Sequence, residues 1–281
     1  MRQVHILLLA WLLAQPCQLA HGAEPQGDGA LVPILVYHRM GRSVTDQMTV
    51  KTSVFASHLA YLRSHGYTVI PLRRLIDYMR GEAPAPPVRS VVITADDGHK
   101  SVFSDMYPLI ARYHIPVTLF IYPSAISNAK YAMTWQQLSQ MRDSGLVDIQ
   151  SHTYWHPNFK REKKRLSGDA YEKFVRLQMV RSKEVLEQRL GGRVDVLAWP
   201  FGIYDEELMR AAAQAGYVAA LSLERRPAGR SDNVMALPRY LMVNPVQGEV
   251  FARLLEAAAP AQQGGTAESR AGSPPGVRGG Q

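Results

Sequence analysis

The chain is poor in the features that cross-link a protein or anchor it in a membrane. It has one cysteine, Cys17, in 281 residues. A lone thiol forms no disulfide within the chain, which excludes the small disulfide-stapled folds. The apolar run at residues 6–13 has eight residues, far fewer than the roughly 20 that span a bilayer. The sequence contains no evident internal repeat, and its length suits one large domain or two small ones.

The first 23 residues are typical of a secretory signal peptide. Arg2 precedes the apolar run, and small residues follow it around positions 20–23. We therefore expect residues 1–23 to be removed, the protein to be exported and periplasmic or extracellular, and no transmembrane span to remain. An uncleaved anchor or a buried helix is the alternative. Pro16 before Cys17 does not fit a lipoprotein acceptor site, so lipidation of Cys17 is not expected.

The chain is basic, with a formal net charge of +8. Removing residues 1–23 takes away only Arg2 and leaves +7. Five of the six residues at 160–165 are basic, which predicts a basic loop. Such a loop suits an anionic polymer or a membrane surface, but charge runs are commonly just solvated faces. Because no aromatic interleaving or recognition motif accompanies it, nucleic acid is not an expected partner.

Segments of strand and helix character alternate between residues 31 and 256. The expected strands are 34–37, 68–70, 91–95, 117–122, 146–151, 194–199, 218–221 and 235–243. The expected helices are 54–65, 72–80, 104–114, 134–144, 169–190 and 206–215. Seven or eight such units predict an α/β fold with a parallel sheet inside helices, in a closed or nearly closed barrel. Residues 257–281, rich in Gly, Pro and Gln, are expected to be a disordered tail.

Two pairs of polar residues stand where expected strands end. Asp96 and Asp97 follow the apolar run 91–95, and His152 and His156 follow the strand at 146–151. Because the carboxyl ends of parallel strands build the sites of α/β folds, we expect these side chains to meet. One Asp and two His suit an open, catalytic divalent-metal site, with Asp97 as ligand and Asp96 free as a base. The alternative for Asp-Asp-Gly alone is an ordinary turn.

Three motifs resemble one family. Thr94-Ala-Asp-Asp-Gly98, Ser151-His-Thr-Tyr-Trp-His-Pro157 and Ala198-Trp-Pro-Phe-Gly202 resemble the polysaccharide deacetylases of the NodB-homology type, carbohydrate esterase family 4. The resemblance covers nearly all of residues 31–250. Pro33-Ile-Leu-Val-Tyr-His38 and the pattern at 55–72 are most similar to the branch that deacetylates poly-β-1,6-N-acetylglucosamine exopolysaccharide.

The resemblance implies a distorted (β/α) barrel, an activity and the residues that carry it. Residues 31–256 would be the catalytic domain, with Asp97, His152 and His156 holding one divalent metal, Zn before Ni, Co or Fe. Asp96 would be the general base, and the backbone N–H of Phe201 would bind the oxyanion. The reaction would be hydrolysis of N-acetyl groups on a β-linked N-acetylglucosamine polymer, which releases acetate and leaves a free amine on the sugar. The implied partners are that polysaccharide and the machinery that makes or exports it.

Two departures from the family pattern concern catalytic groups. Ala198 stands where an arginine often orients the catalytic aspartate, and Arg239 is the candidate replacement, the alternative being a surface arginine. The Leu-x-His motif that supplies the general acid is absent. His38, after the first strand, is the candidate acid or substrate contact, the alternative being a structural histidine.

Aromatic residues beside the histidines suit sugar binding. We expect Tyr154 and Trp155 to contact substrate, although aromatics at strand ends are as often part of a core. Two other functions stay open. One is deacetylation of peptidoglycan or chitin, and the other is a non-catalytic sugar-binding member of the fold.

Overall fold

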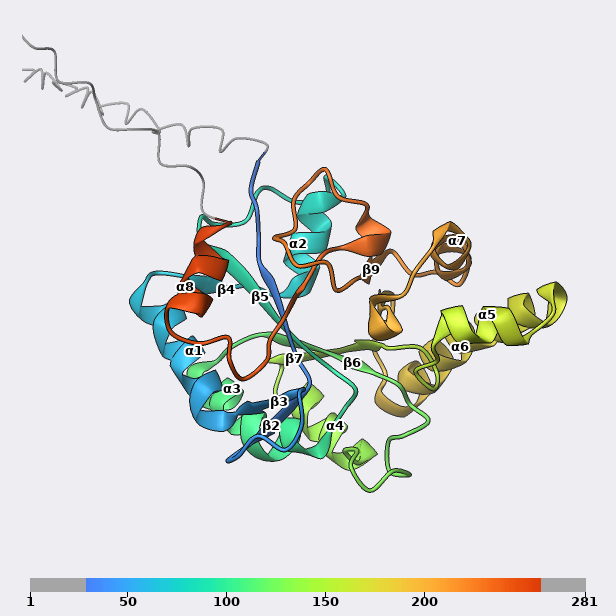
Figure 1. The fold of residues 1–281 in the computed structure, drawn as a ribbon, viewed down its shortest axis with the longest axis horizontal. Coiled ribbons are helices and arrows are strands. Elements are labelled where there is room, and N and C mark those ends of the chain that lie inside the picture. The colour runs from blue at the N-terminus through green and yellow to red at the C-terminus, as the bar shows by residue number, and fades with distance from the viewer. Residues whose placement is uncertain (1–28, 259–281) are drawn as a thin grey trace, which may run out of the picture.

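The computed structural model describes residues 29–258, which form a curled parallel sheet with helices around it (Figure 1). This confirms the predicted α/β barrel. The predicted signal peptide, Cys17 and residues 259–281 lie outside the described residues. Ala257, the first residue of the predicted tail, caps the last helix. In residues 29–258, none of the helices combines the length and the apolar character needed to span a bilayer.

The sheet has eight parallel strands in the order β10-β1-β5-β6-β7-β8-β9, with β4 paired to β5. The strands are β1 (Ile34–Tyr37), β4 (Thr68–Val69), β5 (Ser90–Asp96), β6 (Val117–Ile121), β7 (Val147–Ser151), β8 (Val196–Ala198), β9 (Ala219–Leu221) and β10 (Tyr240–Leu241). Tyr37 of β1 lies beside Ala95, and Ile121 lies beside Ser151. The residues that follow these strands therefore meet at one end of the barrel.

The segment before β10 joins the two edges of the sheet. Leu237 donates to the Ala220 carbonyl at 2.8 Å and accepts from the Ser222 N–H at 2.7 Å, on the β9 edge. Three residues later, β10 pairs with β1. The strand expected at 235–243 is therefore a 3-10 turn (Val234–Ala236), a bridge and a two-residue strand. Arg239 lies between the two sets of contacts and is fully buried.

Helices cover the sheet near their expected positions. They are α1 (Thr52–Ser64), α2 (Leu72–Met79), α3 (Tyr107–Tyr113), α4 (Trp135–Asp143), α6 (Gly168–Leu190) and α7 (Glu206–Gln214). A π-helical turn, Val102–Met106, opens the helix expected at 104–114. Helix α1 buries Phe55, Leu59 and Leu62, as a helix lying on a sheet should.

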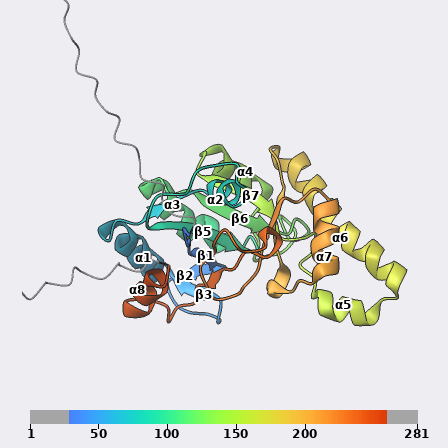
Figure 2. The same cartoon turned by 90° about the horizontal axis from the view of Figure 1, so that it is seen from above.

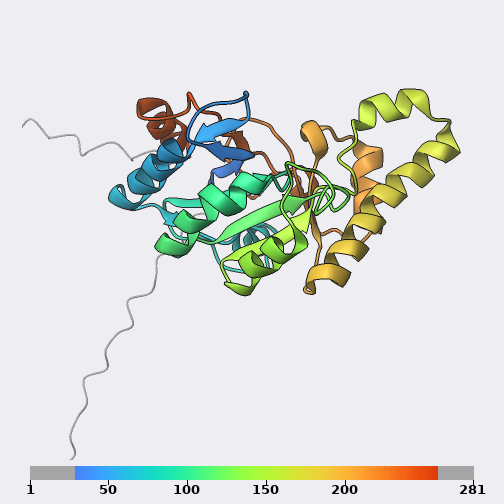
Figure 3. The ribbon, with the colours of Figure 1, turned by 90° about the horizontal axis from the view of Figure 1, so that it is seen from below.

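The sequence did not predict four elements, namely β2 (Arg39–Gly41), β3 (Thr49–Lys51), α5 (Phe159–Arg165) and α8 (Glu249–Glu256). The prediction of a basic loop at 160–165 is wrong, because these basic residues lie in helix α5. Asn158 begins this helix by accepting a hydrogen bond from the Arg161 N–H at 3.0 Å. Helices α5, α6 and α7 lie together at one end of the molecule, with α1 and α8 at the other (Figures 2 and 3).

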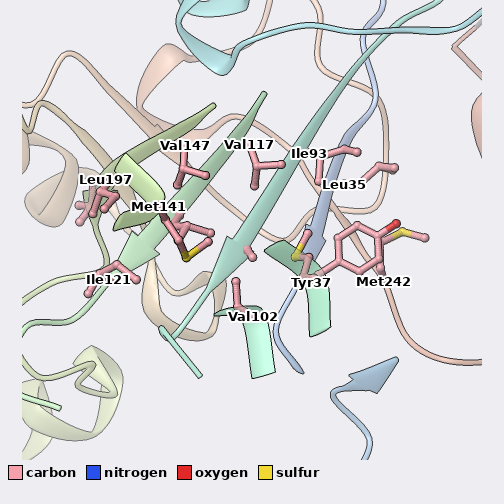
Figure 4. Packing of buried hydrophobic residues seen from close by; sticks show 14 of the residues in the cluster. Leu35, Tyr37, Ile93, Val102, Val117, Ile121, Met141, Val147, Leu197 and Met242 are labelled. Atoms are coloured by element: carbon pink, nitrogen blue, oxygen red, sulfur yellow. The ribbon is translucent and has the colours of Figure 1, made fainter. Parts of the chain in front are cut away.

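Alternation along β5 separates its side chains into two sets. Val91 and Ile93 belong to the larger hydrophobic cluster, part of which Figure 4 shows, whereas Val92 belongs to a second cluster. Since side chains alternate along a strand, Asp96 lies on the same face as Val92. The strand ends there, so Asp97 is free to turn elsewhere.

Candidate metal centre and catalytic site

Asp97, His152 and His156 converge where β5 and β7 end. One ligand atom of each lies within 4.8 Å of those of the other two. The Asp97 Oδ1 atom is 3.6 Å from the Nε2 atoms of both His152 and His156. Two ligands of a tetrahedral ion, each about 2.0–2.2 Å from it, are about 3.3–3.6 Å apart. The spacing and the donor set therefore fit a divalent ion such as Zn²⁺.

A neighbouring carbonyl fixes the orientation of His152. Its Nδ1 donates to the carbonyl oxygen of Ala198 at 2.8 Å, which directs Nε2 toward Asp97. A metal-ligating histidine is commonly oriented in this way, by a second group that holds its other nitrogen. Ala198 thus contributes its backbone where the family often has an arginine side chain.

Burial keeps the second histidine neutral. It lowers the pKa of His156 to about 4, with a further contribution from His152. The imidazole is therefore uncharged at neutral pH, which is the form that binds a metal.

The backbone of the site is unusual. Asp97, Thr153, His156 and Phe201 all have positive φ, between 59° and 73°, although none is glycine. This conformation is costly for residues with a side chain, and it concentrates at functional sites. In this protein it turns the side chains of Asp97 and His156 toward each other at the ends of two strands.

Asp96 is buried and bound at both oxygens by Arg239. The Nη1 and Nη2 atoms of Arg239 donate to Oδ1 and Oδ2 of Asp96 at 2.9 and 2.8 Å. Arg239 itself is held by the Ser222 carbonyl, which its Nε contacts at 3.0 Å. Burial favours protonation of Asp96, but the charge of Arg239 outweighs it with help from His152, and the pKa falls to about 2. Asp96 is therefore a carboxylate with its orientation fixed, and its Oδ2 lies 3.8 Å from His152 Nε2.

His38 lies near the two aspartates with one free ring nitrogen. It is 8% exposed, and its Nδ1 has no hydrogen-bond partner among the described residues. Burial lowers its pKa, against the pull of Asp96 and Asp97. His58 shows the contrast, because its two nitrogens contact the Tyr37 hydroxyl and the Val246 carbonyl at 2.9 and 2.7 Å. His38 lacks the complete set of partners that a purely structural histidine has.

The other expected residues surround this centre. The Phe201 ring is 57% exposed and lies edge-on to His156 at 4.6 Å. Trp155 is 50% exposed and packs on Phe174 of α6 at 5.7 Å. Tyr154 is half-buried.

Tyr122 also lies at the site, although of the aromatic residues at strand ends we expected only Tyr154 and Trp155 to contact sugar. It follows β6, and its ring lies 5.3 Å from that of His156. The strand-end rule that found the histidines applies equally to Tyr122, and its position directly after a buried strand was the available signal.

Comparison with known proteins identifies the fold and the family. Residues 83–220 match the family described as "Polysaccharide deacetylase". The domain at residues 83–220 belongs to the polysaccharide deacetylase family. It is therefore a hydrolase of acetyl groups on a polysaccharide.

Individual deacetylases and related proteins resemble most of the chain. YxkH of Bacillus subtilis is 27% identical over 227 residues, which are 81% of this chain and 77% of that protein. Poly-beta-1,6-N-acetyl-D-glucosamine N-deacetylase of Staphylococcus epidermidis is 26% identical over 206 residues, 72% of this chain and 68% of that protein. The structure of IcaB from Ammonifex degensii superimposes with a TM-score of 0.70 at 24% identity and covers 83% of this chain and 99% of that one. That structural likeness supports the barrel fold.

Proposed function

We propose that this deacetylase hydrolyses N-acetyl groups of a β-1,6-linked N-acetylglucosamine exopolysaccharide and depends on one divalent metal ion. The observation that carries the chemistry is the buried Asp96 carboxylate, fixed by Arg239 and placed beside Asp97, His152 and His156. The substrate follows from relatives that carry the name poly-beta-1,6-N-acetyl-D-glucosamine N-deacetylase at 25–26% identity.

The three ligands would hold the ion, with Zn²⁺ first and Ni, Co or Fe as alternatives. When bound, the ion would act as a Lewis acid that polarises the acetyl carbonyl and activates water. Asp97 offers a carboxylate oxygen and the two histidines offer neutral imidazole nitrogens, which are the donors Zn²⁺ prefers.

The remaining residues move protons and stabilise charge. Asp96 takes a proton from the attacking water as the new C–O bond forms. The Phe201 backbone N–H donates to the oxygen that becomes negative. His38 gives a proton to the sugar nitrogen as the C–N bond breaks, so acetate and a free amine leave.

Substrate contacts and cellular setting complete the proposal. Trp155, half exposed beside α6, and Tyr154 would contact sugar rings of the polymer. If residues 1–23 direct export, the enzyme works in the periplasm or outside the cell, beside the machinery that makes or exports the polysaccharide.

Linkage-defined oligomers test the substrate. Acetate release is measured on pentamers of β-1,6-linked N-acetylglucosamine, on chitin pentamers and on peptidoglycan fragments, each with Zn²⁺ and with a chelator. We expect the β-1,6-linked pentamer to be the best substrate and the chelator to abolish release. Faster release from chitin or peptidoglycan would indicate that this polymer is the substrate instead. Tight sugar binding without release from any of the three, with metal bound, would indicate a binding protein.

His38→Ala tests the proposed acid. We expect the rate of deacetylation to fall about 100-fold, a typical contribution of general acid catalysis, with metal content unchanged. The rate is measured by acetate release and the metal by atomic absorption. His58→Ala is the matched control, because it removes a buried histidine away from the site and should affect stability more than rate. A rate close to that of the wild type in His38→Ala would rule out this role.

A further inference from the structure

A line of aromatic rings leads away from the metal ligand His156. The ring of Tyr122 comes first, 5.3 Å from that of His156. The hydroxyl groups of Tyr122 and Tyr131 are 2.7 Å apart. The ring of Tyr131 is stacked nearly parallel to His99, with 6.3 Å between centroids and 8° between planes. The proposed chemistry uses none of these three residues.

Backbone pairing fixes this line to the turn that carries Asp97. The Lys100 N–H donates to the Tyr131 carbonyl at 2.8 Å, and the Met133 N–H donates to the Gly98 carbonyl at 2.9 Å. The loop that carries Tyr131 is therefore tied to the residues directly after Asp97. Its ring has a set position relative to the metal ligands.

The rings of Tyr131 and His99 offer apolar faces, and a polar side chain lies beside them. The Tyr131 side chain is 42% exposed, and His99 is half-buried. Aromatic rings bind the flat apolar faces of sugars while hydrogen-bond donors bind their hydroxyl groups. A donor is present in Arg39, whose side chain is 37% exposed and whose Nη1 contacts Asp46.

Arg39 lies near these rings. The N–H of Met40, the next residue, donates to the Ser101 Oγ at 2.8 Å, and the same Oγ lies 2.8 Å from the His99 Nδ1. Arg39 and the rings thus lie together beside the turn that carries Asp97. Trp155 lies elsewhere around the metal ligands, because it packs on α6.

We propose that Tyr131, with His99 and Arg39 beside it, binds the sugar unit next to the one that is deacetylated. This rests on the proposed function, because it concerns the same polymer. With Tyr131 and Trp155 at two separate places beside the metal ligands, the site binds a stretch of the polymer and favours oligomers over single sugars.

Binding of oligomers to a metal-loaded protein that cannot turn over tests the contact. Asp96→Asn removes the proposed base and keeps the substrate intact, so calorimetry measures the affinity of the β-1,6-linked pentamer and of the monomer in that background. Adding Tyr131→Ala should weaken pentamer binding about fivefold to tenfold, since a ring contact contributes about that much. Adding Tyr131→Phe keeps the ring and should change affinity less than twofold.

Tyr113→Ala is the matched control. Tyr113 is a similarly exposed tyrosine, at 39%, and it ends α3 shortly before β6 begins, at the far end of that strand from Tyr122. It should leave pentamer affinity unchanged.

Two results would overturn the inference. One is pentamer affinity in the Tyr131→Ala protein equal to that of the Tyr113→Ala control. The other is equal loss in Tyr131→Ala and Tyr131→Phe, which would place the effect in the hydroxyl contact with Tyr122. Acetate release by the wild type is scored separately, and its absence would count against the proposed function alone.

Discussion

Asp96→Asn should lower the rate of acetate release by about 10³-fold while the protein still binds one divalent ion. General base catalysis contributes about 10²–10⁴-fold, and an amide cannot accept the proton. Asn has the shape of Asp and can accept one hydrogen bond from Arg239, so the fold and the three ligands should persist, although the uncompensated charge of Arg239 lowers the free energy of unfolding. Acetate release and metal content are measured on the same preparation.

Asp195→Asn is the control for this prediction. Asp195 is also a fully buried aspartate paired with arginines, Arg73 and Arg193, but it precedes β8 and lies at the other end of the barrel. Its substitution should reduce stability and leave the rate nearly unchanged. A rate for Asp96→Asn within tenfold of that of the wild type would contradict the assignment of Asp96 as base.

Arg239→Met should lower the free energy of unfolding by about 3–5 kcal/mol at pH 7.5. Removing one partner of a buried ion pair leaves the other charge without compensation, and Asp96 is 1% exposed. Met is apolar and similar in length, so little volume is lost. The rate should fall as well, because the base loses the group that orients it. Urea unfolding and acetate release measure the two effects.

The pH dependence separates an ion-pair effect from a packing effect. In the wild type, Asp96 has a pKa of about 2, below its unfolded value, so its stabilising effect is present above about pH 4 and is lost as the pH falls toward 2. Without Arg239, burial raises the pKa of Asp96. The loss of stability is then greatest at pH values above that raised pKa, where Asp96 is charged. The difference in stability between the two proteins should therefore shrink from pH 7.5 to pH 5. Adding Asp96→Asn to the Arg239→Met protein should restore part of the lost stability. A stability difference between Arg239→Met and the wild type that does not change with pH would indicate a packing effect alone.

The sequence predicts the core of the site because strand ends are local features. Asp96, Asp97 and the two histidines each follow an apolar strand, and parallel pairing of β5, β6 and β7 brings their ends together. The position of Arg239 near a late strand was also apparent. Its two hydrogen bonds with Asp96 depend on how β10 crosses to β1, which is a tertiary feature.

Other parts are not encoded in local pattern. Helix α5 buries only Phe159 among seven mostly charged residues, so it has no apolar periodicity to detect. The segment at 235–243 changes partner from β9 to β1, and a continuous apolar run cannot show such a change. The carbonyl of Ala198 that orients His152 is a backbone group, which every residue possesses.

Titration of the metal-stripped protein with Zn²⁺, with acetate release from the β-1,6-linked pentamer followed at each step, tests the central claim most directly. The claim is that Asp97, His152 and His156 hold one ion beside the base Asp96. We predict that release rises in proportion to added Zn²⁺ and stops rising at one ion per chain. Release that is independent of the ion, or absent with one ion bound, would contradict it.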